Sequence, residues 1–180
     1  MPSSAVIFIF GRGRQQVFKM NQQLRVMASQ PMNLILPNLY LGNFFSGFNT
    51  PYLSHHRIKA VLQVCPPMNE SPKDGDAGIQ RWIIPLPDVP STDLYPYFYY
   101  TCHWIQYQLR NGHPVLIHCM AGVSRSATIT IAYLMWEFGW SLEQTIRYVR
   151  QRRNIIRPNS GFLRQLKRWE ETLAQSRNIR

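Results

Sequence analysis

The segment 115–127 constrains the fold more than any other part of this sequence. Val115-Leu-Ile-His118 is a short apolar run that is typical of a strand buried on both faces of a sheet. Cys119 follows directly, the next five residues predict a loop, and Arg125-Ser126 begins a helix expected to span 125–138. A buried strand that leads into a helix through a short loop is typical of α/β proteins.

The rest of the chain predicts the partners that such a strand needs. Turn signals and β-rich composition predict strands within 34–42 (two, turning at Pro37-Asn38), 58–64 and 81–85. Apolar residues recurring every three or four positions predict helices from Asp93 to about 109, over 141–152, and beyond Pro158-Asn159. We therefore expect a single α/β domain, with a central mixed β-sheet flanked by helices.

The chain of 180 residues, 45% of them hydrophobic, is long enough for one domain. No acidic residue precedes Glu70, so the first part of the chain is purely basic. We expect residues 1–31 to be a basic N-terminal extension, with a short helix near 22–28, residues 32–174 to be the compact domain, and residues 175–180 to be a tail. The extension fits a flexible basic arm better than a mitochondrial transit peptide.

Twenty Lys and Arg against nine Asp and Glu give a formal charge of +11. This charge favours anionic partners, namely phosphorylated protein, nucleic acid or an acidic membrane surface, without choosing among them. No apolar run approaches the about 20 residues that span a bilayer. Three cysteines provide no disulfide framework for a chain of this size, which suggests a reducing compartment. We expect a cytoplasmic location, with the nucleus as a further one and the mitochondrion as the alternative.

The loop after Cys119 has the composition of an anion cradle. Its backbone amides can converge on one centre, and the start of the following helix adds positive potential there. Arg125 can offer a planar fork of N–H donors to two phosphate oxygens. The same potential favours the thiolate of Cys119, and Gly122 lets the backbone turn and approach a ligand. The alternative is a buried structural cysteine before an ordinary helix, but the spacing of Cys, Gly, Arg and Ser favours the anion site.

These residues carry a resemblance to a known family. His118-Cys119-x-x-Gly122-x-x-Arg125-Ser126 resembles the signature of the cysteine-based protein tyrosine phosphatases, and the loop resembles the dual-specificity subgroup, especially its small atypical members. Further similar stretches are 35–42 (ILPNLYLG), 84–88 (IPLPD) and 157–166 (RPNSGFLRQL). The resemblance covers 32–174 with its motifs in family order, and it implies a protein-tyrosine-phosphatase-like fold.

The resemblance also implies a role for each matching residue. Cys119 would attack phosphorus to form a phosphocysteine intermediate, and Arg125 would bind the phosphoryl oxygens in the transition state. Ser126 would hydrogen-bond the sulfur and help it leave, while His118 would support the loop. The substrate phosphate would also bind the loop residues Met120, Ala121, Gly122, Val123 and Ser124. No metal and no cofactor is implied.

The leaving oxygen needs a proton, which a carboxylic acid near the loop would supply. The chain contains four aspartates: Asp74, Asp76, Asp88 and Asp93. The first two read as turn residues and Asp93 as a helix cap. Asp88 lies just past a strand, where the resembling family has its general acid and base, so it is the preferred candidate over the other carboxylates.

The remaining cysteines and histidines carry weaker hypotheses. Cys65 ends a strand expected beside the one leading to Cys119, where some members of this superfamily form a reversible disulfide; a buried structural cysteine is the favoured alternative. Cys102 is expected in the core. His55 and His56 suggest no metal site and are expected at the surface.

The leading prediction is a protein phosphatase acting on phosphotyrosine and on phosphoserine or phosphothreonine. Two alternatives stay open: an RNA 5′-phosphatase of the same superfamily, which the charge would suit, and a phosphoprotein-binding scaffold. The loop lacks the His-Gly and Arg-Thr-Gly pattern usual in the RNA enzymes and the lysine usual in the phosphoinositide enzymes. Scaffolds usually lack the nucleophile, whereas Cys119, Arg125 and Asp88 are all present. Nucleic acid is therefore a possible but less favoured partner, and no feature indicates an oligomeric state.

Overall fold

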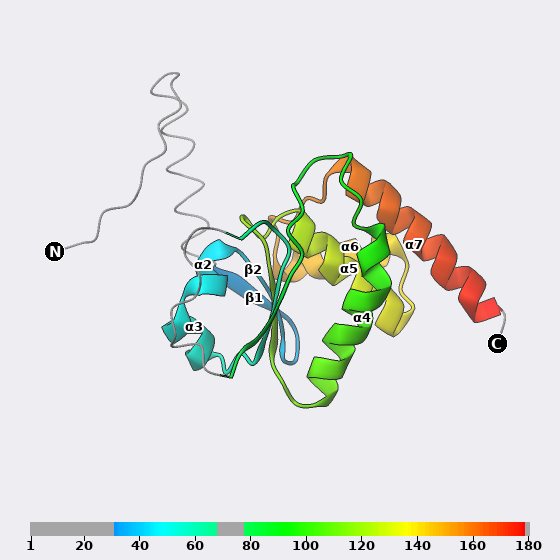
Figure 1. The fold of residues 1–180 in the computed structure, drawn as a ribbon. Helices are drawn as coiled ribbons and strands as arrows, with labels where there is room; N and C mark the ends of the chain where they lie inside the picture. Colours follow the sequence, from blue (N-terminus) through cyan, green and yellow to red (C-terminus); the bar gives the residue numbers. More distant parts are fainter. Residues whose placement is uncertain (1–30, 68–77, 179–180) are drawn as a thin grey trace, which may run out of the picture. The chain divides into compact units, whose positions relative to one another are not determined.

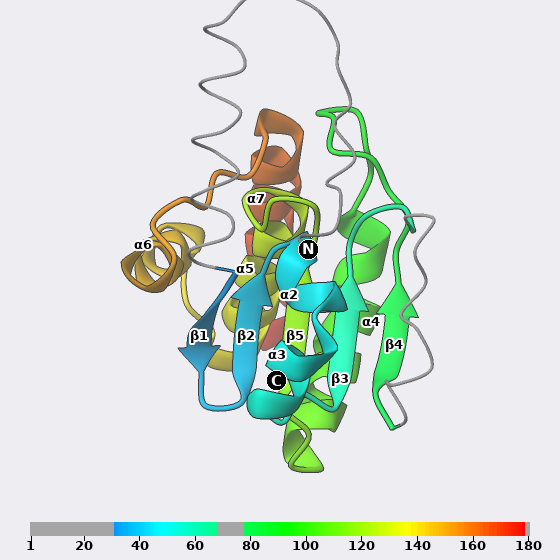
Figure 2. The same cartoon turned by 90° about the vertical axis from the view of Figure 1, so that its left-hand side faces the viewer.

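The computed structural model describes residues 31–67 and 78–178, and a five-stranded sheet forms their middle layer (Figure 1). The strands are β1 (Met32–Leu36), β2 (Leu39–Gly42), β3 (Ala60–Gln63), β4 (Gln80–Ile83) and β5 (Val115–His118). They lie in the order β1-β2-β5-β3-β4, as Figure 2 shows. β1 is antiparallel to β2, and the other pairs are parallel. The predicted mixed sheet is confirmed.

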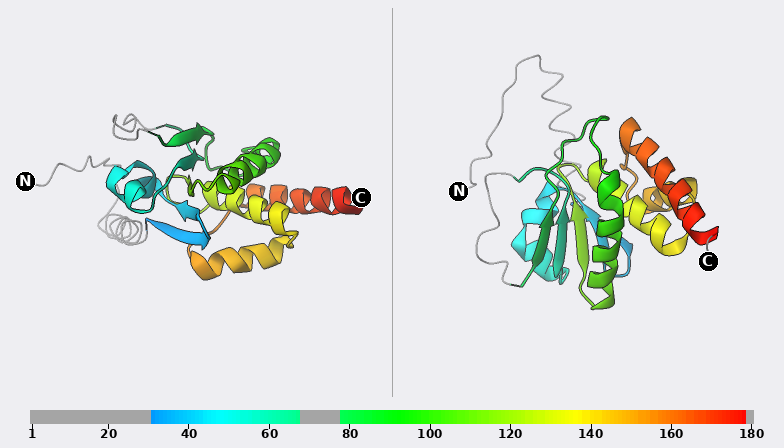
Figure 3. Two further views of the ribbon diagram at one scale, coloured as in Figure 1. Left: turned by 90° about the horizontal axis from the view of Figure 1, so that it is seen from below. Right: turned by 45° about the vertical axis from the view of Figure 1, so that its right-hand side comes forward.

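Helices cover both faces of this sheet (Figures 1 and 3). One face carries α4 (Tyr95–Arg110), α5 (Arg125–Phe138), α6 (Leu142–Arg152) and α7 (Ser160–Asn178). In this layer α5 is central, because it contacts β5 and β2 as well as the three other helices. The opposite face carries the short helices α2 (Phe44–Phe48) and α3 (Thr50–His55).

The side chains of β5 alternate between two hydrophobic clusters. Val115 and Ile117 join the large core on the side of α5, whereas Leu116 joins a smaller cluster with Leu53 of α3 and Ile58. Successive residues of a strand point to opposite faces, so a strand covered on both faces must be apolar throughout. β5 is therefore buried on both faces, as the sequence predicts, and it is the middle strand of the sheet.

Local capping chemistry sets several of the element ends. Asn38 takes φ 64° in the turn between β1 and β2. Ser141 and Gln144 form a complete capping box at the start of α6, and Gly139 takes φ 71° at the end of α5. The start of α4 differs from the prediction: the helix begins at Tyr95, and Asp93 caps it from outside by accepting a hydrogen bond from the Tyr95 amide at 3.1 Å.

The sequence reasoning did not predict α2 and α3. Five and six residues make too few turns for a hydrophobic period to be visible. Their signal lies instead in two asparagine caps: the side chain of Asn43 accepts from the Ser46 amide at 3.3 Å, and that of Asn49 accepts from the Tyr52 amide at 3.0 Å.

Parts of the sequence predictions lie outside the described residues: the basic extension before residue 31, the helix near 22–28 and most of the loop at 71–78. At the other end, α7 continues to Asn178, so residues 175–178 extend the helix and are not the separate tail that was expected. No helix among the described residues is long and apolar enough to cross a membrane.

Candidate active site

The predicted site residues follow the carboxyl ends of the parallel strands. Because β2, β5, β3 and β4 run in one direction, these ends share one edge of the sheet. Cys119 follows the central strand β5, Cys65 lies two residues after β3, and the segment with Asp88 follows β4. The topology thus brings together residues that are distant in the sequence.

The loop 119–125 turns its carbonyl groups outward. The Met120 carbonyl accepts a hydrogen bond from the Phe44 amide at 3.1 Å, and the Val123 carbonyl accepts one from the Arg157 amide at 2.8 Å. Between them, Arg153 donates to the carbonyls of Ala121 at 3.3 Å and Gly122 at 2.8 Å. The N–H and C=O groups of a trans peptide point in opposite directions, so the amides of 121–124 face the interior of the loop. This is the geometry of an anion cradle.

Cys119 lies at the base of this loop and is only 1% exposed. Its Sγ accepts hydrogen bonds from the Gly122 amide at 3.2 Å and from the Ser126 hydroxyl at 3.1 Å. Both groups direct a hydrogen-bond donor at the sulfur atom. The contact of Ser126 with the sulfur is the one the family resemblance implies.

Arg125 and Asp88 meet at the mouth of the loop. Arg125 is the first residue of α5 and is 8% exposed. It donates from one terminal nitrogen to the Leu86 carbonyl at 2.9 Å, and its Nε lies 3.6 Å from Oδ2 of Asp88. The structure therefore places the preferred carboxylate directly beside the predicted phosphate-binding guanidinium.

His118 lies on the face of the sheet that α2 covers, and a supporting role for it in the loop stays a prediction. Its ring packs against Phe48 with centroids 5.9 Å apart and fills the space beside Gly47, where a Cβ atom would collide with the imidazole. Burial, followed by the charge of Arg81, lowers its pKa to about 4. The imidazole is therefore neutral at pH 7 and packs as part of the core.

Arg153 is the site residue that sequence reasoning missed. Its position in an Arg152-Arg153 pair indicated only a basic helix end, yet its side chain is fully buried. Besides the two loop carbonyls, its guanidinium donates to Oδ1 of Asn33 at 2.6 Å. Burial lowers its pKa to about 10, so it stays charged at pH 7. Gly122, at φ 66°, fits between this guanidinium and the Gly42 carbonyl, where a side chain would clash.

Cys65 lies close enough to Cys119 for the two thiols to influence each other. Val64 donates its amide to the His118 carbonyl at 2.8 Å, which continues the β3–β5 pairing up to these cysteines. Burial, and next the proximity of Cys119, raises the pKa of Cys65 to about 11. Cys65 is therefore a neutral thiol at pH 7, and a pairing with Cys119 stays a prediction.

The other candidates lie elsewhere. Cys102 is buried in the core, where desolvation raises the pKa of its thiol well above the usual range. His55 is exposed and His56 half-buried, and their rings meet edge to face at the end of α3. Asp74 and Asp76 lie outside the described residues. Within the described parts of the chain, no cluster of His, Cys, Asp or Glu could hold a metal ion.

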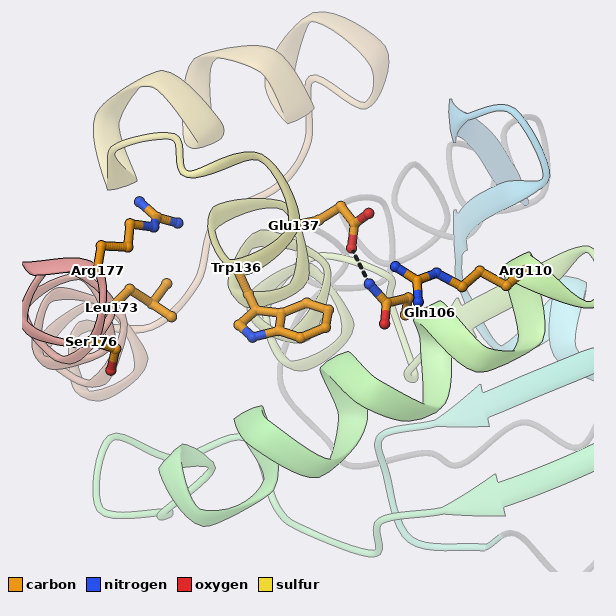
Figure 4. A pocket seen from close by; sticks show the side chains of 7 residues that line it. All are labelled: Gln106, Arg110, Trp136, Glu137, Leu173, Ser176 and Arg177. Atoms are coloured by element: carbon orange, nitrogen blue, oxygen red, sulfur yellow. Dashed lines mark hydrogen bonds between the residues drawn. The ribbon is translucent and has the colours of Figure 1, made fainter. Parts of the chain in front are cut away.

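A cavity of about 380 Å³ lies between α4, α5 and α7 (Figure 4). Its polar side chains bond to other parts of the helical layer: Gln106 donates to Glu137 at 2.9 Å, and Arg177 donates to the carbonyls of Gly139 and Met135, both at 3.2 Å. Because Arg177 thereby caps the end of α5, we interpret this cavity as part of the helix packing.

A buried cysteine at the base of inward-facing amides, with an arginine at the helix start and an aspartate beside it, defines the class of cysteine-based protein tyrosine phosphatases. Residues 39–172 match the profile of the family "Dual specificity phosphatase, catalytic domain". The chain belongs to this family, which confirms the resemblance seen in the sequence.

Curated relatives support the same assignment. Human dual specificity protein phosphatase 22 is 38% identical over 142 residues, which cover 78% of this chain and 74% of the relative. Mouse protein phosphatase Slingshot homolog 3 is 36% identical over 158 residues, which cover 87% of this chain. That match spans only 24% of the Slingshot protein, so the chain corresponds to one part of that larger relative.

Solved structures show the same fold. Human DUSP28 superimposes with a TM-score of 0.74 at 29% identity, covering 81% of this chain and 96% of that one. A mouse putative dual specificity phosphatase, solved with zinc tungstate, gives a TM-score of 0.75 at 32% identity, covering 81% and 91%. The human tyrosine phosphatase-like serine/threonine/tyrosine-interacting protein gives 0.73 at 32% identity, covering 78% and 96%.

His118 should make the fold sensitive to mild acid. Between pH 6.5 and about 4 the unfolded chain binds a proton that the folded imidazole excludes, so the free energy of unfolding falls as pH decreases, by roughly 3 kcal/mol. Urea titrations across this pH range should show that the free energy of unfolding depends less on pH in His118→Gln than in the wild type. The exposed His55 provides the control, His55→Gln, whose curve should follow the wild type; equal curves for all three proteins would contradict the assignment.

Replacing Arg153 should loosen the loop. Arg153→Met leaves the carbonyls of Ala121 and Gly122 without the donor that Arg153 supplies. The free energy of unfolding should therefore fall by about 2–4 kcal/mol. Inorganic phosphate should also inhibit the phosphatase activity of this variant less strongly. The control is Arg152→Met, which removes an exposed guanidinium stacked 3.5 Å from the Tyr148 ring. If both variants lose the same amount of stability, the hydrogen bonds of Arg153 to the loop carbonyls do not hold the loop in place.

Mild peroxide tests the pairing of Cys65 with Cys119. Oxidation of the Cys119 thiolate to a sulfenic acid, followed by attack of the Cys65 sulfur, would release water and form a disulfide. The intact mass should fall by the two thiol hydrogens in the wild type and in Cys102→Ser. In Cys65→Ser, peroxide should instead add oxygen to Cys119. A wild-type protein that shows only added oxygen would refute the pairing.

Proposed function

We propose that this chain is a protein phosphatase that hydrolyses phosphotyrosine, and phosphoserine or phosphothreonine, through a phosphocysteine intermediate. The observation that carries the proposal is the environment of Cys119: its sulfur accepts two hydrogen bonds at the centre of a loop whose amides face inward. Such a site binds a phosphoryl group and holds a nucleophile beneath it.

The first step transfers the phosphoryl group to the enzyme. The Cys119 thiolate donates an electron pair to phosphorus, and the bond between phosphorus and the leaving oxygen breaks. Arg125 and the loop amides stabilise the charge on the phosphoryl oxygens. The leaving oxygen keeps the electron pair of the broken bond and takes a proton from the Asp88 carboxylic acid.

The second step releases phosphate. Water attacks the phosphocysteine, the Asp88 carboxylate accepts its proton, and the sulfur leaves as a thiolate. The Ser126 hydroxyl, 3.1 Å from the sulfur, stabilises the charge that returns to it. No metal ion is required for either step as written.

Two short connections beside the site support the acceptance of both classes of phosphoresidue. The segment 84–94 joins β4 to α4 directly, and α7 follows soon after α6. Little chain is left in these connections to build walls that would exclude a short phosphoserine or phosphothreonine side chain. The family name of the relatives, dual specificity, supports the same proposal.

A scaffold function is the second candidate, because one structural neighbour is named as phosphatase-like and as an interacting protein. The presence of Cys119 at the loop base favours catalysis for this chain. The two candidates differ in one measurable respect, since a scaffold binds phosphopeptides without turnover.

The test is kcat/KM against pH for para-nitrophenyl phosphate without metal. Cys119→Ser should lose turnover by about 1,000-fold or more while still binding phosphate, and Asp88→Asn should lose about 100-fold at the pH optimum of the wild type, because it has no acidic proton to give to the leaving oxygen. The exposed Asp93→Asn is the matched control and should keep the wild-type profile.

Phosphopeptides with phosphotyrosine or phosphothreonine, and an RNA with a 5′-triphosphate, then separate the candidates. Turnover of both peptides supports the proposal. Binding of peptides by a folded, reduced protein without turnover would favour the scaffold, and turnover of the RNA alone would favour the RNA phosphatase.

A further inference from the structure

The motif 157–166 has no part in the reaction described so far, yet the structure packs it against the loop that carries Asp88. We propose that Asn159 and Ser124 position the proton of the Asp88 carboxylic acid on Oδ2, so that this acid is oriented for the leaving group before substrate binds. The inference rests on the proposed function, because it assigns positioning residues to that same site.

Both residues donate to the same carboxylate oxygen. The Ser124 hydroxyl and the Asn159 side-chain nitrogen each donate to Oδ1 of Asp88, both at 2.8 Å. A carboxylate oxygen has two lone pairs in its plane, and these two donors use them. Protonation of Oδ1 would cost one of these hydrogen bonds, so the proton belongs on Oδ2. That oxygen lies on the side of Arg125, whose Nε is 3.6 Å away.

The two donors are themselves held in one orientation. The backbone amide of Asn159 donates to the Ser124 hydroxyl oxygen at 3.2 Å. The hydroxyl proton is then free to be donated to Asp88. The side-chain oxygen of Asn159 accepts from the Phe162 amide at 3.0 Å, which fixes the donating nitrogen toward Asp88. Asp88, Ser124 and Asn159 thus form a closed triangle of hydrogen bonds. It joins the loop that carries Asp88 (84–94, the acid loop) to the loop 119–125 and to the start of α7.

The rest of the motif holds the acid loop in place. Gly161 packs so closely against the Pro90 carbonyl that no side chain would fit between them. The Gln165 side chain donates to the Thr92 carbonyl at 2.7 Å and accepts from the Leu94 amide at 2.8 Å. The segment 90–94, which directly follows Asp88 along the chain, therefore rests on the first turns of α7.

A general acid has a distinctive kinetic signature. Its proton matters for a leaving group that departs as a strong base and matters little for one that departs readily as an anion. We therefore choose phenyl phosphate and 2,4-dinitrophenyl phosphate as the two substrates. The readout is the ratio of their kcat/KM values, which a general loosening of the cradle would not change.

Asn159→Ala and Ser124→Ala should each lower the phenyl to dinitrophenyl ratio about 10-fold or more, in the same direction as Asp88→Asn. Ser124→Thr keeps the hydroxyl donor and should restore the ratio. In the Asp88→Asn background, Asn159→Ala should change the ratio no further. The matched control is Asn154→Ala, an exposed asparagine of the preceding turn, which should keep the wild-type ratio.

Asn159 also caps α7, so thermal unfolding is recorded for each variant. Should Asn159→Ala fail to fold, the comparison of Ser124→Ala with Ser124→Thr decides the question alone. Equal losses on both substrates, or a wild-type ratio in Ser124→Ala, would overturn the positioning role. Failure of the proposed function looks different: the wild type would turn over neither substrate, or Cys119→Ser would retain the wild-type rate.

Discussion

The rest of the site depends on the hydrogen bonds that hold four consecutive carbonyl groups of the loop 119–125 pointing outward. A loop of free peptides would orient its dipoles at random, and its amides would not converge on one point. Here α2, the buried guanidinium of Arg153 and the segment after α6 each hold one or two carbonyls of 120–123. Because the carbonyls are fixed outside, the amides are fixed inside, which creates a positive potential at the centre of the loop.

This arrangement explains why so much of the domain converges on seven residues. The parallel strands bring Cys119 and the acid loop to one edge of the sheet, and the start of α5 adds Arg125. His118, at the end of β5, fills the space beside Gly47 of α2 as a neutral ring. Groups that are held in place in this way would need no rearrangement when charge develops on a phosphoryl group, as the proposed reaction requires.

The sequence predicted the sheet, the large helices and most of the site, because each leaves a local signal. The apolar run of β5, the caps of α5 and α6, and the Cys-Gly-Arg-Ser spacing can all be read within short windows. Arg153 could not be predicted in this way, since its burial depends on Asn33 and on loop carbonyls about 30 residues or more away. Nor could α2 and α3, which are too short to show a period.

The roles of Ser124 and Asn159 were hidden for the same reason. Each belongs to a motif that sequence reasoning noticed, but the contact between the motifs, through Asp88, exists only in three dimensions. The fifth residue of the loop, Ser124, and a helix cap, Asn159, look like ordinary local features when each is taken on its own.

The central claim is that the Cys119 sulfur carries the phosphoryl group during turnover. Rapid acid quench of the protein with a phosphotyrosine peptide, followed by mass mapping, tests this most directly. The account predicts a phosphoryl group on the peptide that contains Cys119, and none in Cys119→Ser. Steady turnover without any phosphorylated cysteine, or with the label on another residue, would contradict it.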